Sequence, residues 1–263
     1  MIIKEASSDL HTSNGPMRTC VFYPAAPGKY PGVVLFSEIF QVTGPIRRTA
    51  ALLAGHGFVV AVPEIFHELE EIGRVLPYDQ AGADRGNKDK TTKKLESYDE
   101  DSRVLLEYLK ERADCSGKLG CVGICIGGHL SFRCAMNPQV RAAVCFYATD
   151  IHKRGLGLGT NDNSLDRIPE IKGELLMFWG KQDPHIPPEG RALIYQKLSA
   201  AGTVFSWHEF NGQHAFLRDE GPRYDAALAM NCYRMALDLF YRKLGEGDLN
   251  VEQIDPATAE GRH

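Results

Sequence analysis

Three residues of the chain belong to the types that nucleophilic hydrolysis requires: a cysteine, an aspartate and a histidine. Cys125 stands in the stretch Gly-Ile-Cys-Ile-Gly-Gly, and Asp183 and His214 each come a few residues after a later apolar run. A thiol attacks an acyl carbon as the thiolate, histidine accepts its proton, and a carboxylate holds the imidazole in the required tautomer. These residue types therefore indicate acyl chemistry through a cysteine nucleophile.

Glycines surround the cysteine where a strand is expected to end and a helix to begin. The apolar run Leu119–Ile124 predicts a strand, and His129–Asn137 predicts a helix, so Cys125 falls on the turn between them. A turn this tight forces its central residue into strained backbone angles, and side chains at Gly123 and Gly127 would collide with the neighbouring elements. The alternative is a glycine-rich turn that contains a cysteine by chance.

This position has chemical consequences for Cys125. The turn lifts the sulfur to the carboxyl edge of the sheet, where open α/β sheets bind ligands. The beginning of the helix carries a partial positive charge, which favours a thiolate. The backbone N–H of the next residue, Ile126, is directed at the same point and can stabilise an oxyanion.

The elements that must position these residues alternate between strands and helices. Near-continuous apolar runs are typical of strands buried on both faces of a parallel sheet. The expected strands are Thr19–Tyr23, Gly32–Phe36, Phe58–Val62, Leu119–Ile124, Ala142–Tyr147, Leu175–Trp179 and Val204–Phe210. Further helices are expected at Pro45–Gly55, Tyr98–Arg112, Glu189–Ala201 and Tyr224–Leu244. The pattern predicts an α/β fold, a mostly parallel, doubly wound sheet with helices on both faces.

Two stretches lack this regularity. Residues 67–94 are rich in charge and poor in apolar side chains, which indicates a long, functional or mobile loop. Residues 245–263 are polar and acidic, and we expect them to form a loosely held tail. No linker divides the remainder, so we predict a single domain over residues 1–244.

The order of the three candidate residues supports a shared site. Asp183 and His214 each follow the end of a predicted strand, and Cys125 precedes both in the chain. All three would project from one edge of the sheet, in the order nucleophile, acid, histidine that α/β-hydrolases use. Alone, Asp183 would be read as a turn residue. Together the three residues predict a catalytic triad.

Composition excludes several classes of function. The chain has 263 residues, 43% of them hydrophobic, and a net charge of −4, with no basic tract for nucleic acid. No apolar run reaches the ~18 residues that span a bilayer, and no secretory signal is evident. Seven cysteines without a Cys-x-x-Cys pair indicate reduced thiols and a cytoplasmic protein. No phosphate-binding loop, dinucleotide motif or metal-ligand cluster is found, so we expect no cofactor and no metal.

The chain resembles the dienelactone hydrolase (carboxymethylenebutenolidase) family of the α/β-hydrolase fold over about residues 15–243. The resemblance rests on the stretches Ser-Glu-Ile-Phe-Gln (37–41), Val-Pro-Glu-Ile-Phe (62–66), Gly-Ile-Cys-Ile-Gly-Gly (123–128), Gly-Lys-Gln-Asp-Pro-His-Ile-Pro (180–187) and His-Ala-Phe-Leu-Arg (214–218). It implies that Glu38 hydrogen-bonds the resting thiol and that the backbone N–H of Ile39 completes the oxyanion hole with Ile126. A carboxylate beside the cysteine would disfavour the thiolate by like-charge repulsion.

The resemblance also implies arginines that bind a substrate carboxylate. Arg218, four residues after the histidine, matches one of them, although it could instead pair with a neighbouring acid such as Asp219. A second family arginine would fall at Ala83 in an alignment without gaps, which leaves Arg85 or Arg74 as substitutes. Aromatic and histidine side chains at or after strand ends are further candidates for the lining of the pocket. These are Tyr147, Trp179 and His185.

The predicted function is hydrolysis of small, anionic lactones or esters through a thioester acyl-enzyme, in a monomer or homodimer. A generic ester or thioester hydrolase, or an acyltransferase, would use the same triad and would differ in substrate or product. A non-catalytic ligand-binding protein would be favoured by loss of Asp183 or His214, and both are present. A redox-sensing thiol protein would need a resolving cysteine near Cys125, for which Cys121 and Cys134 are the nearest in sequence.

Overall fold

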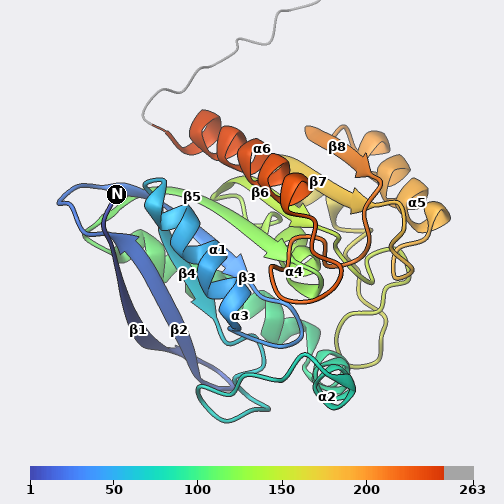
Figure 1. The fold of residues 1–263 in the computed structure, drawn as a ribbon, viewed down its shortest axis with the longest axis horizontal. Coiled ribbons are helices and arrows are strands. Elements are labelled where there is room, and N and C mark those ends of the chain that lie inside the picture. The colour runs from blue at the N-terminus through green and yellow to red at the C-terminus, as the bar shows by residue number, and fades with distance from the viewer. Residues whose placement is uncertain (246–263) are drawn as a thin grey trace, which may run out of the picture.

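The computed structural model describes residues 1–245, and these form one eight-stranded sheet with the strand order β1-β2-β4-β3-β5-β6-β7-β8 (Figure 1). The first two strands pair antiparallel, β2 pairs antiparallel with β4, and all pairs from β4 to β8 are parallel. The strands are β1 (Ile3–Thr12), β2 (Gly15–Pro24), β3 (Tyr30–Phe36), β4 (Val59–Pro63), β5 (Cys115–Ile124), β6 (Val140–Phe146), β7 (Glu174–Gly180) and β8 (Phe205–Phe210). The predicted α/β class and the mostly parallel sheet are confirmed.

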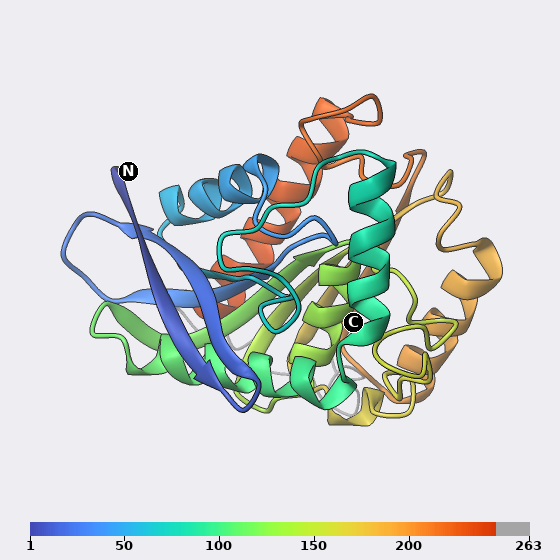
Figure 2. The ribbon, with the colours of Figure 1, turned by 90° about the horizontal axis from the view of Figure 1, so that it is seen from below.

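Helices cover both faces of the sheet (Figure 2). On one face α1 and α6 lie together, and on the other α3 packs beside α4. The helices are α1 (Gly44–Gly55), α2 (Gln80–Thr92), α3 (Leu95–Glu111), α4 (Ile126–Cys134), α5 (Pro188–Ala200) and α6 (Ala226–Leu244), with a short 3₁₀ turn at Ile168–Glu170. Across residues 1–245, no helix combines the length and the apolar character needed to span a bilayer.

The core lies between these layers, because the central strands are apolar on both faces. Every residue of β4 is buried, as are Gly32–Phe36 in β3 and Leu119–Ile124 in β5. Burial of this kind contributes about 25 cal/mol for each Å² of apolar surface removed from water. The strand that leads to Cys125 is therefore in the most firmly held part of the sheet, whereas β8, which leads to His214, is an edge strand without a fully buried residue.

The first strand, β1, was not predicted from the sequence. Its burial pattern is mostly exposed, and its sequence, Ile-Lys-Glu-Ala-Ser-Ser-Asp-Leu-His-Thr, has few apolar residues. It forms by backbone pairing with β2 at the edge of the sheet, which leaves little trace in hydrophobic periodicity. Central strands can be recognised in the sequence because residues on both of their faces are apolar, whereas an exposed edge strand lacks this signal.

The loop predicted over residues 67–94 is a correction. Its second half is the helix α2, whose N-terminus is capped by the Asp79 carboxylate accepting the Gly82 N–H. The only buried residues of α2 are Gly82, Gly86 and Asp89, so the helix has no apolar face from which it could have been recognised. The rest of the predicted tail, residues 246–263, lies outside the described residues, so that prediction is not tested.

Candidate active site

Cys125 sits between β5 and α4 with backbone angles φ 62° and ψ −120°. This conformation is strained for any residue with a side chain, at a cost of order 1–3 kcal/mol. Backbone hydrogen bonds hold it: the Cys125 N–H donates to the Phe146 carbonyl at 3.1 Å, and its own carbonyl accepts from Gly128 at 3.0 Å. The strained turn is thus fixed to the end of β6 and to the first turn of α4.

The glycines around Cys125 are required by their surroundings. A Cβ atom on Gly123 would lie 1.8 Å from the Gly127 carbonyl oxygen, and one on Gly127 would lie 2.2 Å from the Phe36 carbonyl oxygen. Gly128 is also tight, at 2.8 Å from the Phe146 oxygen. The obstructing atoms are backbone, which cannot rotate away as a side chain does, so the steric prediction for Gly123 and Gly127 is confirmed.

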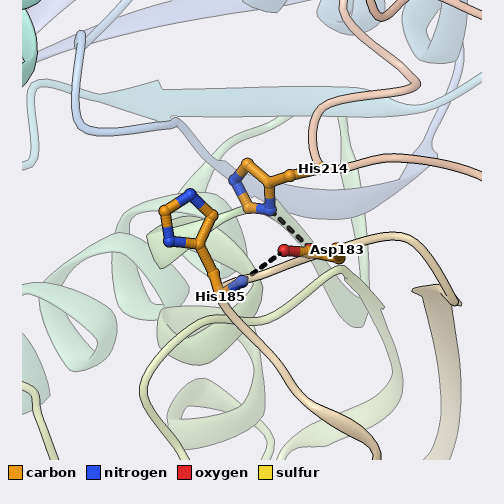
Figure 3. A group of neighbouring side chains, drawn as sticks. All are labelled: Asp183, His185 and His214. Atoms are coloured by element: carbon orange, nitrogen blue, oxygen red, sulfur yellow. Dashed lines mark hydrogen bonds and ion pairs between the residues drawn. The ribbon is translucent and has the colours of Figure 1, made fainter.

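The structure brings the three candidate catalytic side chains together. His214 Nε2 lies 3.3 Å from Cys125 Sγ, and His214 Nδ1 lies 2.6 Å from Asp183 Oδ2. The second carboxylate oxygen of Asp183 accepts the backbone N–H of His185 at 2.8 Å, as Figure 3 shows. The three side chains come from the ends of β5, β7 and β8, and all three residues are buried.

Electrostatics of this arrangement favour a charged imidazole. Burial by itself would lower the pKa of His214, but the neighbouring Cys125 sulfur and the Asp183 carboxylate outweigh burial and raise the pKa to about 10. The His185 ring packs edge-on against the His214 ring at 4.6 Å between centroids. Burial and then the His214 charge lower the pKa of His185, so that ring tends to remain neutral.

The segment after β3 carries the candidate oxyanion peptide, Ile39, and is held by contacts that sequence reasoning missed. Gln41 adopts φ 67°, and its fully buried side chain donates to the Arg74 carbonyl and accepts from the Phe66 N–H. From the other side α2 approaches closely, because a Cβ atom on Gly86 would lie only 2.4 Å from the Ile39 carbonyl oxygen. Ile126, the second candidate donor, is the first residue of α4, beside Cys125.

Glu38 occupies the same cavity but not the predicted contact. Its carboxylate accepts from the Tyr78 hydroxyl at 3.3 Å and lies 3.8 Å from an Arg218 nitrogen. Within residues 1–245, no hydrogen bond joins Glu38 to the Cys125 thiol, whose side-chain partner is His214. Burial raises the pKa of Glu38, and Arg218 opposes that rise. The expected contact between Glu38 and the resting thiol is therefore corrected to one with Tyr78 and Arg218.

Arg218 turns into the cavity, where its guanidinium lies over the Tyr78 ring at 4.2 Å from the centroid. The alternative, in which Arg218 pairs with Asp219 or Glu220, does not hold. Both of those carboxylates are bound by Arg48 instead, at 2.6 Å and 2.7 Å. Arg218 is thus directed toward the same space as Cys125 by stacking on Tyr78, a residue that the sequence-based reading did not single out.

A cavity of about 590 Å³ opens at Cys125 and His214, both of which line it. Its lining includes Glu38, Phe40, Tyr78 and Arg218, together with residues of α2 and of the segment that follows β6. The cations along its lining, beyond Arg218, are Lys90, Lys153 and Arg223. None of these three was predicted from the sequence. The volume suits a small-molecule substrate.

The two arginines considered as the second cation lie outside the cavity lining. Ala83 lines the cavity, but Arg85 does not, since its guanidinium pairs with Glu70 and Asp89 on another side of α2. Arg74 is exposed outside the cavity lining and takes part through its carbonyl, which binds Gln41. The structure therefore offers no support for either arginine as the missing cation.

The predicted aromatic lining is corrected in part. Tyr147 is fully buried and packs edge-on against the His214 ring at 4.9 Å, behind the catalytic side chains. Trp179 is also fully buried and is not part of the cavity lining, whereas His185 is. Tyr147 therefore supports the imidazole through packing and does not face the cavity.

One group of side chains has donor atoms close enough to hold a metal ion. Asp183, His185 and His214 offer ligand atoms within 4.8 Å of one another (Figure 3). Both Asp183 oxygens are already engaged, one by the His214 ring and one by the His185 backbone. A metal ion would have to replace the hydrogen bond between Asp183 and His214, so we assign no metal to this group.

The cysteines nearest in sequence do not form a redox pair with Cys125. Cys121 and Cys134 are completely buried. The Cys121 thiol donates to the Ser131 backbone carbonyl and accepts a hydrogen bond from the Ser131 hydroxyl. A resolving thiol must reach the reactive sulfur. The geometry therefore does not favour the redox-sensor alternative.

Comparisons with known proteins agree with this architecture. The sequence profile of the dienelactone hydrolase family matches residues 17–244. The chain is 43% identical, over 93% of its length and 93% of the relative's, to a putative carboxymethylenebutenolidase of Saccharomyces cerevisiae. It is 28% identical to the carboxymethylenebutenolidase of Pseudomonas putida, over 81% of this chain and 87% of that one. A solved structure of a putative dienelactone hydrolase from Klebsiella pneumoniae superposes with a TM-score of 0.81 and 21% identity, covering 92% of this chain and 100% of that one.

Proposed function

This chain belongs to the dienelactone hydrolase family and is a hydrolase, and from that premise we propose that it cleaves small, carboxylate-bearing lactones or esters with Cys125 as nucleophile. The observation that carries the proposal is the position of the His214 ring. It lies between Cys125 Sγ, at 3.3 Å, and Asp183 Oδ2, at 2.6 Å, on the floor of the cavity. A histidine held between a thiol and a carboxylate is the arrangement that activates a cysteine for attack on an acyl carbon.

The reaction follows from the chemistry of these groups. His214 accepts the proton of the Cys125 thiol, and the thiolate attacks the acyl carbon to give a tetrahedral oxyanion. The backbone N–H groups of Ile39 and Ile126 stabilise that oxyanion, a contribution of roughly 2.7–4 kcal/mol for one donor. The C–O bond then breaks, the leaving oxygen takes the proton from His214, and a thioester remains.

The second half of the reaction regenerates the thiol. His214 removes a proton from a water molecule, the water oxygen attacks the thioester carbon, and the C–S bond breaks with release of the acid. Asp183 keeps the imidazole in the tautomer that presents Nε2 to the reacting atoms throughout. With its pKa raised to about 10, His214 holds the proton that the leaving group needs at neutral pH.

Recognition of an anionic substrate is assigned to Arg218. Its guanidinium is largely buried, stacked on Tyr78, and only 3.8 Å from Glu38, which leaves donors for a second carboxylate. Arriving substrate would then compete with Glu38 for Arg218. A freed Glu38 would affect the thiolate through its charge, at a distance and not through a hydrogen bond.

The test is a panel of small esters and lactones assayed with wild type, Cys125→Ala and a matched control, Cys20→Ala. Cys20 is a partly exposed thiol outside the cavity. We expect wild type and Cys20→Ala to hydrolyse the panel equally and Cys125→Ala to be inactive. Iodoacetamide should inactivate wild type as it modifies Cys125. Full activity of Cys125→Ala, or of protein alkylated at Cys125, would overturn the proposal.

Product analysis separates hydrolysis from acyl transfer by the same triad. A hydrolase releases the free acid even when an alcohol, thiol or amine is present at millimolar concentration. An acyltransferase would return the acid joined to that acceptor. Mass spectrometry of the products after complete turnover distinguishes the two outcomes.

A further inference from the structure

The lining of the cavity also holds a compact charged cluster. The Asp150 carboxylate binds Lys90 Nζ at 2.7 Å through one oxygen and Lys153 Nζ at 2.8 Å through the other. All three side chains line the cavity. Asp150 and Lys90 are largely buried, whereas 56% of the Lys153 side chain is exposed.

This cluster carries an excess of positive charge. Burial opposes ionisation of Asp150, but Lys90 and Lys153 lower its pKa to about 2, so the carboxylate is charged at neutral pH. Two ammonium groups therefore share one negative charge. Each ammonium has three N–H donors, and Asp150 engages one from each. The Lys153 ammonium, which is the exposed one, keeps donors for a further anion.

The topology places the cluster and Arg218 on opposite sides of the nucleophile. Cys125 follows β5, whose neighbours in the sheet are β3 on one side and β6 on the other. Glu38, the neighbour of Arg218, follows β3, whereas Asp150 follows β6, and the Thr149 N–H binds the Cys125 carbonyl at 3.3 Å. Adjacent strands are ~4.8 Å apart. The strand order therefore places Glu38 and Asp150 on the two flanks of Cys125.

We propose that Lys90, Asp150 and Lys153 form a second anion-binding subsite, so that the preferred substrate carries one carboxylate on each side of its scissile carbonyl. Lys153 donates to the second carboxylate, and Lys90 is a positioning residue that holds Asp150 and, through it, Lys153. This inference rests on the proposed hydrolase function and narrows its substrate class to dianionic lactones and esters.

The kinetic test uses four aryl esters that differ only in charge. The acyl group is glutaryl or its neutral amide, glutaramoyl, and the leaving phenol bears a 4-carboxylate or a 4-carboxamide. For each enzyme, kcat/KM is measured for all four esters, with the reaction of Cys125→Ala subtracted as a blank. The ratio of acid to amide then reports the gain from each carboxylate separately, because the amides match the acids in size.

The enzymes are wild type, Lys153→Met, Arg218→Met and a control, Lys88→Met. Lys88 is exposed on α2, close to Lys90 in sequence but outside the cavity lining. We expect Lys153→Met to lower the gain from one of the two carboxylates about threefold to tenfold and Arg218→Met to lower the gain from the other. Lys88→Met should leave both gains as in wild type.

The proposal is overturned if Lys153→Met alters neither gain, if both gains depend on Arg218 alone, or if Lys88→Met acts like Lys153→Met. The last outcome would mean a diffuse effect of net charge and not a subsite. Esters that wild type does not hydrolyse at all would count against the proposed hydrolase function instead.

A binding experiment tests the subsite independently of turnover. Glutarate and glutaramate are titrated calorimetrically into Cys125→Ala and into the double variant Cys125→Ala/Lys153→Met. We expect glutarate to bind Cys125→Ala several-fold more tightly than glutaramate, and this preference to shrink in the double variant. An equal preference in both proteins would overturn the second subsite even if hydrolysis is confirmed.

Discussion

The floor of the cavity and the wall formed by α2 are held in place by different forces. Cys125, Asp183 and His214 follow β5, β7 and the edge strand β8, of which β5 and β7 are buried at their carboxyl ends. Backbone hydrogen bonds fix the turn at Cys125. In α2, by contrast, two of the three buried residues are glycines, and ion pairs such as Lys90 with Asp150 tie it to the rest of the chain. The sheet therefore holds Cys125 in position, whereas side chains of α2 could be substituted without disturbing the sheet.

The difference suggests a division of labour. Reaction chemistry needs atoms placed within a few tenths of an ångström, and strand ends in a packed sheet supply that precision. Substrate choice needs charges at suitable places on a surface, which a helix packed through glycines can provide. Changes to the floor should therefore affect turnover, and changes to the walls should affect discrimination between substrates.

The largest expected effect is on the floor. His214→Ala should lower kcat by about three to six orders of magnitude, because the members of a triad act as a unit. Circular dichroism and thermal unfolding should show that the fold is retained. A His214→Ala enzyme with turnover near that of wild type would contradict the proposal that the floor of the cavity determines turnover.

Arg218→Ala should change the discrimination between anionic and neutral substrates more than it changes the chemical step. Truncating one partner of a buried, charge-assisted contact costs about 2–5 kcal/mol, so kcat/KM for an anionic lactone should fall by more than tenfold. A neutral ester of the same size should lose much less, and the ratio of the two values is the quantity to measure. An unchanged ratio would remove the role of this wall in carboxylate recognition.

Gly86→Ala tests the contact between the two regions. The new Cβ would lie 2.4 Å from the Ile39 carbonyl oxygen, so α2 or the Ile39 segment must shift, at a cost of about 1–3 kcal/mol in stability. We expect kcat to fall about tenfold for anionic and neutral esters alike, through displacement of the oxyanion donor. Gly55→Ala is the matched control, since this helical glycine has no atom within 4 Å of an added Cβ. Equal behaviour of the two variants would separate α2 from the catalytic floor.

The protonation of His214 offers a spectroscopic comparison. Its pKa of about 10 depends on the Cys125 sulfur and on Asp183, both of which oppose the effect of burial. Cys125→Ala removes the sulfur, so the pKa of the imidazole should fall by more than about 1 pH unit, and the charged form should be lost at lower pH. Nitrogen NMR of the labelled ring across pH 5–11 measures this. The same midpoint in both proteins would contradict a thiolate–imidazolium pair.

The smallest expected effect concerns Glu38. Because it contacts Tyr78 and Arg218 and not the thiol, its influence on Cys125 is limited to charge. Glu38→Gln should raise the rate of iodoacetamide alkylation of the free enzyme only about twofold to fivefold, while turnover of anionic substrates falls. A much larger increase in alkylation would indicate a direct bond between Glu38 and the resting thiol in solution.

Much of the floor could be predicted because its physical constraints are local. The strained turn at Cys125 leaves no room for side chains at Gly123 and Gly127, so the turn can be recognised from the two glycines in the sequence. The strand before the turn and its neighbours in the sheet can be recognised as continuous apolar stretches, because both of their faces are buried. Chain order and the positions at strand ends then indicated that Asp183 and His214 share a site with Cys125.

Glu38 and Arg218 were expected near the site from the family resemblance, and both line the cavity. The contacts of the walls could not be predicted, because they join segments that are distant in sequence and carry no periodic pattern. Lys90 meets Asp150 from 60 residues away, and Tyr78 meets Glu38 from 40. The side of α2 on which a charge falls decides its role: Arg85 points to Glu70, whereas Lys90, five residues on, faces the cavity.

The sequence by itself thus determined the fold class and the identity of the candidate nucleophile, acid and base. Backbone sterics and hydrophobic burial act over a few residues and leave a direct trace in composition. Only the tertiary structure decided which cations line the cavity and which form surface ion pairs such as Arg48 with Asp219. The direction of a charged side chain is set by whichever partners the packed helices and loops bring near it, and no short stretch of sequence contains that information.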